Sequence, residues 1–205
     1  MSQTTVIGID LDNTLACYDG IFHLAACEER LIDACTPRSK ERIRDTIRLL
    51  PDGENQWTRL QAIVYGPRMR EARLFDGAAD FLRHCAAKGV RTLVVSHKTP
   101  IAMLDGAAVD LRKSALEWLD ATGFFTDFSM SRGDVFFETT RAEKIDRIRM
   151  EGCAHFIDDL AEVFAESAFP REVVKVLFAP HGTASDLPGV HVCASWAEIE
   201  RSFFP

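Results

Sequence analysis

The sequence predicts an α/β protein with a Rossmann-like core, in which helices cover both faces of a parallel β-sheet. Short apolar stretches alternate along the chain with segments whose apolar residues follow helical spacing. The apolar stretches are hydrophobic almost throughout, which is typical of strands in a parallel sheet buried on both faces. Three of them end in polar side chains, and ligands bind beyond the carboxyl ends of the strands in such sheets.

Four segments are predicted to be strands of this core. They are residues 6–9, 91–95, 154–157 and 173–178. Three helices are expected between or beside them, over residues 78–88, 111–119 and 143–150. The first of these helices stops before Gly89, because glycine readily adopts the backbone conformation that ends a helix.

A segment near the N-terminus departs from this alternation. Residues 16–73 carry three stretches with helical spacing, and the second is expected to begin at Thr36-Pro37, a cap followed by a first-turn proline. Pro51-Asp52-Gly53 separates the second stretch from the third, and Gly66-Pro67 ends the third. We therefore expect residues 1–15 and 74–205 to form the α/β core, with residues 16–73 inserted as an α-helical cap.

Composition narrows the class of protein. The net charge of -7 over 205 residues argues against general nucleic-acid binding, which favours a basic surface. A continuous run of 18 apolar residues, which would indicate a membrane span, is absent, and the first residues lack the pattern of a signal peptide. The expected location is the cytoplasm. The six cysteines form no CxxC pair, so a zinc cluster or redox motif is not predicted.

Two carboxylates stand two residues apart at the end of the first predicted strand. They belong to Asp10 and Asp12. Alternate residues of an extended chain face the same side, so both can approach one ligand. Because two anions this close repel each other, they need a cation or a shared proton. Mg²⁺ prefers oxygen ligands and often accompanies phosphate substrates, so the pair suggests a magnesium-dependent phosphate site.

Further polar residues complete a set suited to phosphoryl transfer. Asp158 and Asp159 follow the third predicted strand, Ser96 follows the second, and Lys144 lies in a predicted helix. Such a reaction needs a nucleophile, a group that moves the proton, and donors for the phosphoryl oxygens. Lys175 is an alternative source of positive charge, but it lies in the middle of a predicted strand.

With these residues in place, the chain resembles the haloacid dehalogenase (HAD) superfamily and, within it, the phosphatases. The resemblance covers roughly the whole chain except the helical insertion. Four motifs carry it in the expected order, namely Asp10-Leu11-Asp12-Asn13-Thr14, Ser96, Lys144 and Asp158-Asp159. In this family an insertion after the first motif is a small helical cap that closes over the site and selects substrates.

The resemblance implies a role for each motif residue. Asp10 is the expected nucleophile and a metal ligand. Asp12 is the expected general acid and base, with its backbone carbonyl on Mg²⁺. Ser96 and Lys144 are expected to bind the phosphoryl oxygens, and Lys144 also to restrain Asp10.

The remaining residues are placed around this centre. Asp158 is expected to complete the metal site directly, and Asp159 to bind through water or to orient a ligand. Glu162, one helical turn beyond Asp158, is a candidate outer partner. His97 and Lys98 follow Ser96 and are candidate contacts to the leaving group or to a second anionic group of the substrate.

The expected substrate is a small phosphorylated metabolite, handled by a monomer or a homodimer. Residues 37–73 contain nine basic and five acidic side chains, so this part of the insertion has an excess of positive charge that favours an anionic substrate. The expected activity is a phosphomonoester hydrolase that works through an aspartyl-phosphate.

Several alternatives remain open. A phosphomutase or another phosphotransferase of this type would use the same residues. A dehalogenase has no use for Asp12 as a proton donor, and a phosphonatase would need a reactive lysine in the insertion, where Lys40 is the only one. A catalytically silent domain that binds a phosphorylated ligand is the alternative from another class.

Overall fold

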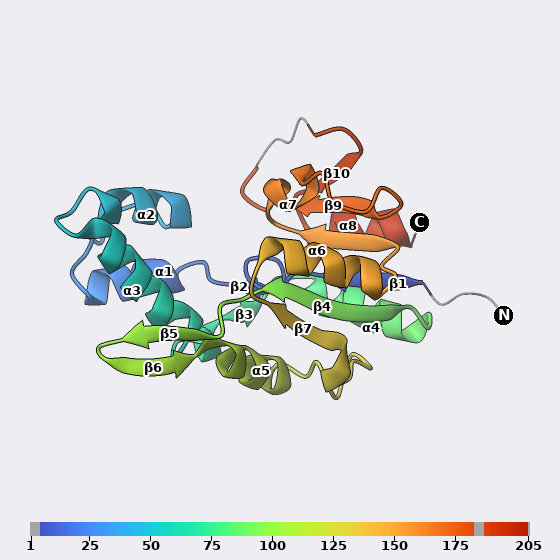
Figure 1. Ribbon diagram of the computed structural model, residues 1–205, viewed down its shortest axis with the longest axis horizontal. Coiled ribbons are helices and arrows are strands. Elements are labelled where there is room, and N and C mark those ends of the chain that lie inside the picture. Colours follow the sequence, from blue (N-terminus) through green and yellow to red (C-terminus); the bar gives the residue numbers. More distant parts are fainter. Residues whose placement is uncertain (1–4, 183–186, 205) are drawn as a thin grey trace. The chain divides into compact units, whose positions relative to one another are not determined.

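The computed structural model describes residues 5–182 and 187–204, and the chain divides into two compact units (Figure 1). The first unit takes the described parts of Met1–Ala16, Leu74–Lys98 and Thr122–Pro205. The second unit consists of Cys17–Arg73 and Thr99–Ala121. The chain passes between them within two short strands, β2 (Ala16–Cys17) and β3 (Arg73–Leu74), and again at residues 98–99 and 121–122.

The first unit is built on a six-stranded sheet with the order β10-β9-β8-β1-β4-β7. Every pairing in it is parallel. The strands are β1 (Val6–Ile9), β4 (Arg91–His97), β7 (Val135–Glu138), β8 (His155–Asp158), β9 (Val174–Phe178) and β10 (Val190–Cys193). The predicted Rossmann-like parallel sheet is confirmed. Strand β1 lies between β4 and β8, where the strand order reverses, which is the place where such sheets bind ligands.

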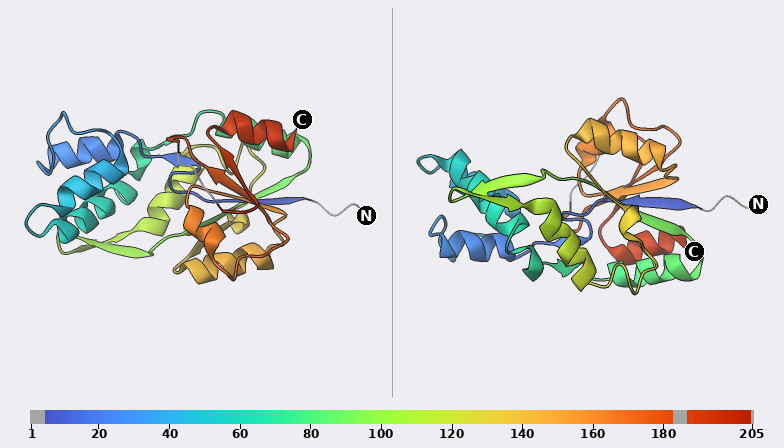
Figure 2. Two further views of the ribbon diagram at one scale, coloured as in Figure 1. Left: turned by 90° about the horizontal axis from the view of Figure 1, so that it is seen from above. Right: turned by 60° about the horizontal axis from the view of Figure 1, so that its bottom comes forward.

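Helices cover both faces of this sheet (Figure 2). Helices α4 (Ala78–Ala87) and α8 (Trp196–Phe203) lie on one face, and α6 (Arg141–Met150) and α7 (Ala161–Ala165) on the other. Ile145 and Ile148 of α6 pack with Leu93 and Phe156 of the sheet in a buried apolar cluster. A short 3-10 helix, η2 (Arg132–Asp134), precedes β7.

The four predicted strands are confirmed; β1 has the predicted bounds, and the ends of the other three differ by at most two residues. The predicted helices over 78–88, 111–119 and 143–150 are also present, as α4, α5 (Leu111–Ala121) and α6. Strands β7 and β10 were not expected. Both lie at the edges of the sheet and are only partly buried, so they lack the continuous apolar run that marks a central strand.

The second unit contains helices and a β-hairpin. Its elements are α1 (Ile21–Glu28), α2 (Lys40–Arg48), α3 (Gly53–Tyr65), the 3-10 helix η1 (Met69–Glu71), β5 (Ile101–Leu104), β6 (Ala107–Asp110) and α5. Trp118 of α5 donates its indole N–H to the carbonyl of Ala72 at 2.7 Å. Arg59 of α3 forms ion pairs with Glu29 and with Asp105 in the hairpin turn. Residues 99–121 are thus joined to this unit, whereas the sequence placed them in the core.

One local expectation for the insertion differs from the structure. Helix α2 begins at Lys40 with Ser39 as its cap, three residues beyond the expected start at Thr36-Pro37. The side-chain oxygen of Ser39 accepts from the N–H of Arg42, which supplies the cap that the proline position does not. Within the insertion, Arg68 forms ion pairs with Glu28 and Glu71. Among the described residues, no helix is both long and apolar enough to cross a membrane.

Candidate active site

The end of β1 places Asp10 in the middle of the first unit. The N–H of Asp10 donates to the carbonyl of Ile157 in β8 at 2.9 Å, so the carboxyl ends of the two strands are tied together. Beyond Asp10 the chain turns sharply, because Asn13 adopts a left-handed backbone with a φ of 63°. Asparagine tolerates this conformation better than most residues. The N–H of Ala16 closes the turn on the carbonyl of Leu11 at 2.8 Å.

Lys144 joins two carboxylates from neighbouring strands. Its Nζ lies 2.6 Å from Oδ1 of Asp10 and 2.7 Å from Oδ2 of Asp158, and all three side chains are buried. A capping box of Thr140 and Glu143 fixes the start of α6 and thereby the position of Lys144 in the first helical turn. A cation is unfavourable at a helix N-terminus by roughly 0.3–1 kcal/mol. Two buried ion pairs outweigh this cost and hold the ammonium in place.

The buried carboxylates perturb one another. Burial is the main reason that the pKa of Asp10 is raised to about 6; Lys144 opposes this rise, and the charges of Asp158 and Asp12 add to it. Burial alone would lower the pKa of Lys144, but the carboxylates of Asp10 and Asp158 together leave it above its ordinary value. Lys144 is therefore charged, and it does not neutralise the surrounding acids by itself.

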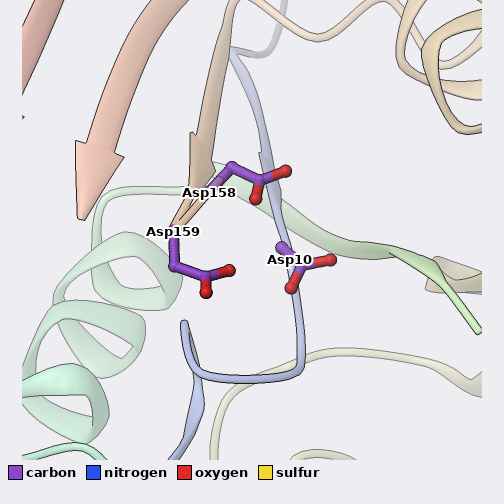
Figure 3. A group of neighbouring side chains, drawn as sticks. All are labelled: Asp10, Asp158 and Asp159. Carbon is purple, nitrogen blue, oxygen red and sulfur yellow. The ribbon is translucent and has the colours of Figure 1, made fainter. Parts of the chain in front are cut away.

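Three carboxylates converge at the ends of β1 and β8 (Figure 3). Oxygen atoms of Asp10, Asp158 and Asp159 all lie within 4.8 Å of one another. Thr14 donates its hydroxyl to Oδ1 of Asp159 at 3.3 Å, and the N–H of Leu160 donates to Oδ1 of Asp158 at 3.0 Å. The carboxylates are thus oriented by the loops that follow the two strands.

The charge and the donor atoms of this group fit a hard divalent cation. Asp10, Asp158 and Asp159 supply oxygen ligands only, which is the donor set that Mg²⁺ prefers. Four carboxylates, counting Asp12, face two lysines, so a formal charge of -2 remains at the site. A divalent cation would balance this charge.

Asp12 is held by a second buried lysine. The Nζ of Lys98 lies 3.0 Å from Oδ1 and 2.8 Å from Oδ2 of Asp12. The side chain of Lys98 is 3% exposed, and that of Asp12 is 18% exposed. Each of the first two acids in the motif therefore has its own lysine, with Lys144 on Asp10 and Lys98 on Asp12.

The other candidate residues take different positions. Ser96 is buried in β4, one residue before the strand ends. The ring of the exposed His97 contacts the carbonyl of Thr139 through Nε2 at 2.8 Å. Glu162 is exposed on α7 and does not belong to the three-carboxylate group. Lys175, the alternative to Lys144, donates to the carbonyl of Phe164 at 2.9 Å.

The raised pKa of Asp10 makes a prediction for the metal-free protein. The pKa of this carboxyl is higher in the folded protein, about 6, than in the unfolded chain, 3.8. Its contribution to the free energy of unfolding is therefore full below pH 3.8 and is lost as the pH rises through about 6. The loss amounts to at most about 3 kcal/mol. Urea unfolding of wild type and Asp10→Asn in a chelator should therefore show the variant gaining relative stability between pH 4 and 7. A difference between the two that does not change with pH would contradict this.

Comparison with known proteins identifies the fold. No protein-family model matches the sequence, and no curated protein matches it either. Similar solved structures include a haloacid dehalogenase-like hydrolase from Streptococcus pneumoniae, at 15% identity and a TM-score of 0.63 over 99% of this chain and 100% of that one. A HAD family hydrolase from Deinococcus radiodurans with bound phosphate and sodium is 16% identical, with a TM-score of 0.58 over 99% and 96%.

A third similar structure is the HAD hydrolase YfnB from Bacillus subtilis bound to magnesium, at 12% identity and a TM-score of 0.59 over 100% of both chains. The chain therefore has the fold of the haloacid dehalogenase-like hydrolases.

Proposed function

We propose that the protein is a magnesium-dependent phosphomonoester hydrolase of the HAD phosphatase type, which works through an aspartyl-phosphate. One observation carries the proposal. The group of buried Asp10, buried Asp158 and half-buried Asp159 adjoins Lys144, and the Asp12 carboxylate is held separately by Lys98. Because each carboxylate has a different partner, the arrangement supports separate roles, with Asp10 as the nucleophile and Asp12 as the group that transfers the proton.

In the first proposed step, a carboxylate oxygen of Asp10 attacks the phosphorus atom. An O–P bond to Asp10 forms, the bond from phosphorus to the ester oxygen breaks, and Asp12 gives its proton to that leaving oxygen. In the second step, Asp12 takes a proton from water while the water oxygen attacks phosphorus. The bond between phosphorus and Asp10 then breaks and releases phosphate.

The surrounding residues support these steps in the proposal. Lys144 keeps Asp10 oriented and presents positive charge near the phosphoryl oxygens, and Ser96 is a candidate hydrogen-bond donor to them. Mg²⁺ held by Asp10, Asp158, Asp159 and the carbonyl of Asp12 would supply further positive charge that offsets the repulsion between two anions.

A hydrolytic dehalogenase is the rival reaction within the fold. That chemistry has no need of a proton donor at Asp12 or of a cation site. The Lys98–Asp12 pair and the three-carboxylate group both favour the phosphatase. His97 as a substrate contact, the small phosphorylated substrate, the cytoplasmic location, the choice between monomer and homodimer, and a capping role for residues 16–73 remain predictions.

The test is phosphate release from a panel of phosphorylated sugars, nucleotides and acids, together with p-nitrophenyl phosphate. We expect turnover with Mg²⁺ and loss of turnover in excess chelator, with recovery when Mg²⁺ is added back. A 2-haloacid should yield no halide under the same conditions. A folded protein that binds Mg²⁺ yet hydrolyses no member of the panel would instead indicate a domain that only binds a phosphorylated ligand.

A further inference from the structure

The side chain of Lys98 is almost fully buried. It is 3% exposed, and its Nζ donates to both carboxylate oxygens of Asp12, at 2.8 and 3.0 Å. Burial of an ammonium is strongly unfavourable unless an anion lies beside it. The Asp12 carboxylate therefore helps to stabilise the buried ammonium of Lys98, and Lys98 in turn stabilises the Asp12 carboxylate.

The backbone of Lys98 is fixed by the sheet. Its N–H donates to the carbonyl of Glu138 at 2.8 Å, directly beyond the parallel register that pairs Ser96 with Phe137 and His97 with Glu138. The ring of His97 also contacts the Thr139 carbonyl. Lys98 thus extends a rigid strand edge.

Asp12 lies in the turn that follows β1, where its backbone pairs with Ala16 in an isolated bridge outside the sheet. The two hydrogen bonds from Lys98 restrain the position of this carboxylate and the plane in which its oxygens lie. Each carboxylate oxygen has two lone-pair sites, so an oxygen that accepts from Lys98 can still face a reacting group.

We propose that Lys98 is a positioning residue that holds the Asp12 carboxylate for proton transfer, and that it acts on the substrate through Asp12 instead of contacting it. The inference rests on the proposed function, in which Asp12 moves the proton. It replaces the role expected from the sequence, where the place of Lys98 beside the phosphate pocket suggested a substrate contact. A displaced acid or base lowers the rate of the chemical step and leaves substrate binding nearly intact.

The first test is a double-mutant cycle on p-nitrophenyl phosphate with Mg²⁺. Lys98→Met is expected to lower kcat by about 100-fold with little change in KM. In an Asp12→Asn background the same substitution should change kcat by less than about threefold, because residues that act as a unit are not additive. Lys98→Arg, which keeps a cation with several donors, should retain more of kcat than Lys98→Met.

Lys175→Met is the matched control, since Lys175 is a half-buried lysine of the same unit, and the kcat of this variant should equal that of wild type.

The second test measures thermal unfolding of the same variants in chelator without substrate. Each single substitution at Lys98 or Asp12 should lower Tm, and the double variant should recover part of the loss because neither charge is left unpaired. If Lys98→Met does not fold, Lys98→Gln keeps a donor and serves in its place.

Two kinetic results would overturn the proposal. One is a rise in KM of more than about tenfold with kcat unchanged, which indicates uniform substrate binding. The other is an equal loss of kcat in both backgrounds. A wild-type protein without activity on any phosphoester refutes the proposed function, and the catalytic role of Lys98 falls with it. The unfolding cycle separately shows whether the two charges are coupled.

Discussion

Replacing Asp10 by asparagine is expected to abolish phosphate release while the protein remains folded. The amide that replaces the carboxylate is a poor nucleophile, so the aspartyl-phosphate cannot form. Loss of a nucleophile in covalent catalysis lowers kcat on the order of 10⁴-fold or more. The measurement is kcat on the best substrate of the panel, together with mass spectrometry of rapidly acid-quenched wild-type enzyme, which should show one phosphoryl group on the peptide that contains Asp10.

The matched control for this experiment is Asp80→Asn. Asp80 is an exposed acid of the same unit that pairs with Arg83 within α4, so its removal tests the effect of losing one carboxylate away from the site. Its kcat should be unchanged. Residual activity of Asp10→Asn within tenfold of wild type would show that water attacks phosphorus directly and that Asp10 serves only to bind the cation.

Much of this site could be predicted from the sequence, because its residues lie at the ends of strands or at the start of a helix, and such positions can be recognised from neighbouring residues in the chain. Asp10 and Asp158 each end a short apolar segment, and a buried parallel strand places whatever follows it at one edge of the sheet. Lys144 lies near the start of a helix that the apolar spacing over residues 143–150 predicts, although the prediction did not identify its cap, Thr140. These features need no knowledge of which strands are neighbours.

The contacts that orient these side chains could not be predicted in the same way. Lys98 and Asp12 are 86 residues apart, and Thr14 and Asp159 are 145 residues apart. Their contacts depend on the order of β8, β1 and β4 in the sheet and on the turn at Asn13, which residue types alone do not determine.

The extent of the second unit was missed for a related reason. The apolar face of α5 shows that the helix is buried on one side, but periodicity does not say which partner covers it. The bond from Trp118 to Ala72 joins α5 to the inserted segment. This contact links two parts of the chain that are far apart in sequence, so only the structure reveals it.

Replacing Lys144 by methionine is expected to have the largest effect on stability. The substitution keeps most of the side-chain volume but leaves Asp10 and Asp158 buried without their cation. Breaking a buried ion pair in this way costs about 3–5 kcal/mol, which corresponds to a decrease in Tm of about 10 °C for a chain of this length. The measurement is thermal and urea unfolding in chelator at pH 7.5, which lies above the pKa of about 6 of Asp10 in the wild-type protein.

Two comparisons separate lost charge from disturbed packing. Lys175→Met removes a lysine that donates to a backbone carbonyl, and it should cost only about 1 kcal/mol. Adding Asp10→Asn to Lys144→Met removes one of the unpaired acids, so the double variant should be more stable than Lys144→Met alone. If the two substitutions instead destabilise additively, the stabilising role of Lys144 is packing of its alkyl chain, and the charge balance inferred for the site is wrong. Recovery in the double variant would show that excess negative charge is what the site must offset, which is the same property that suits it to a divalent cation.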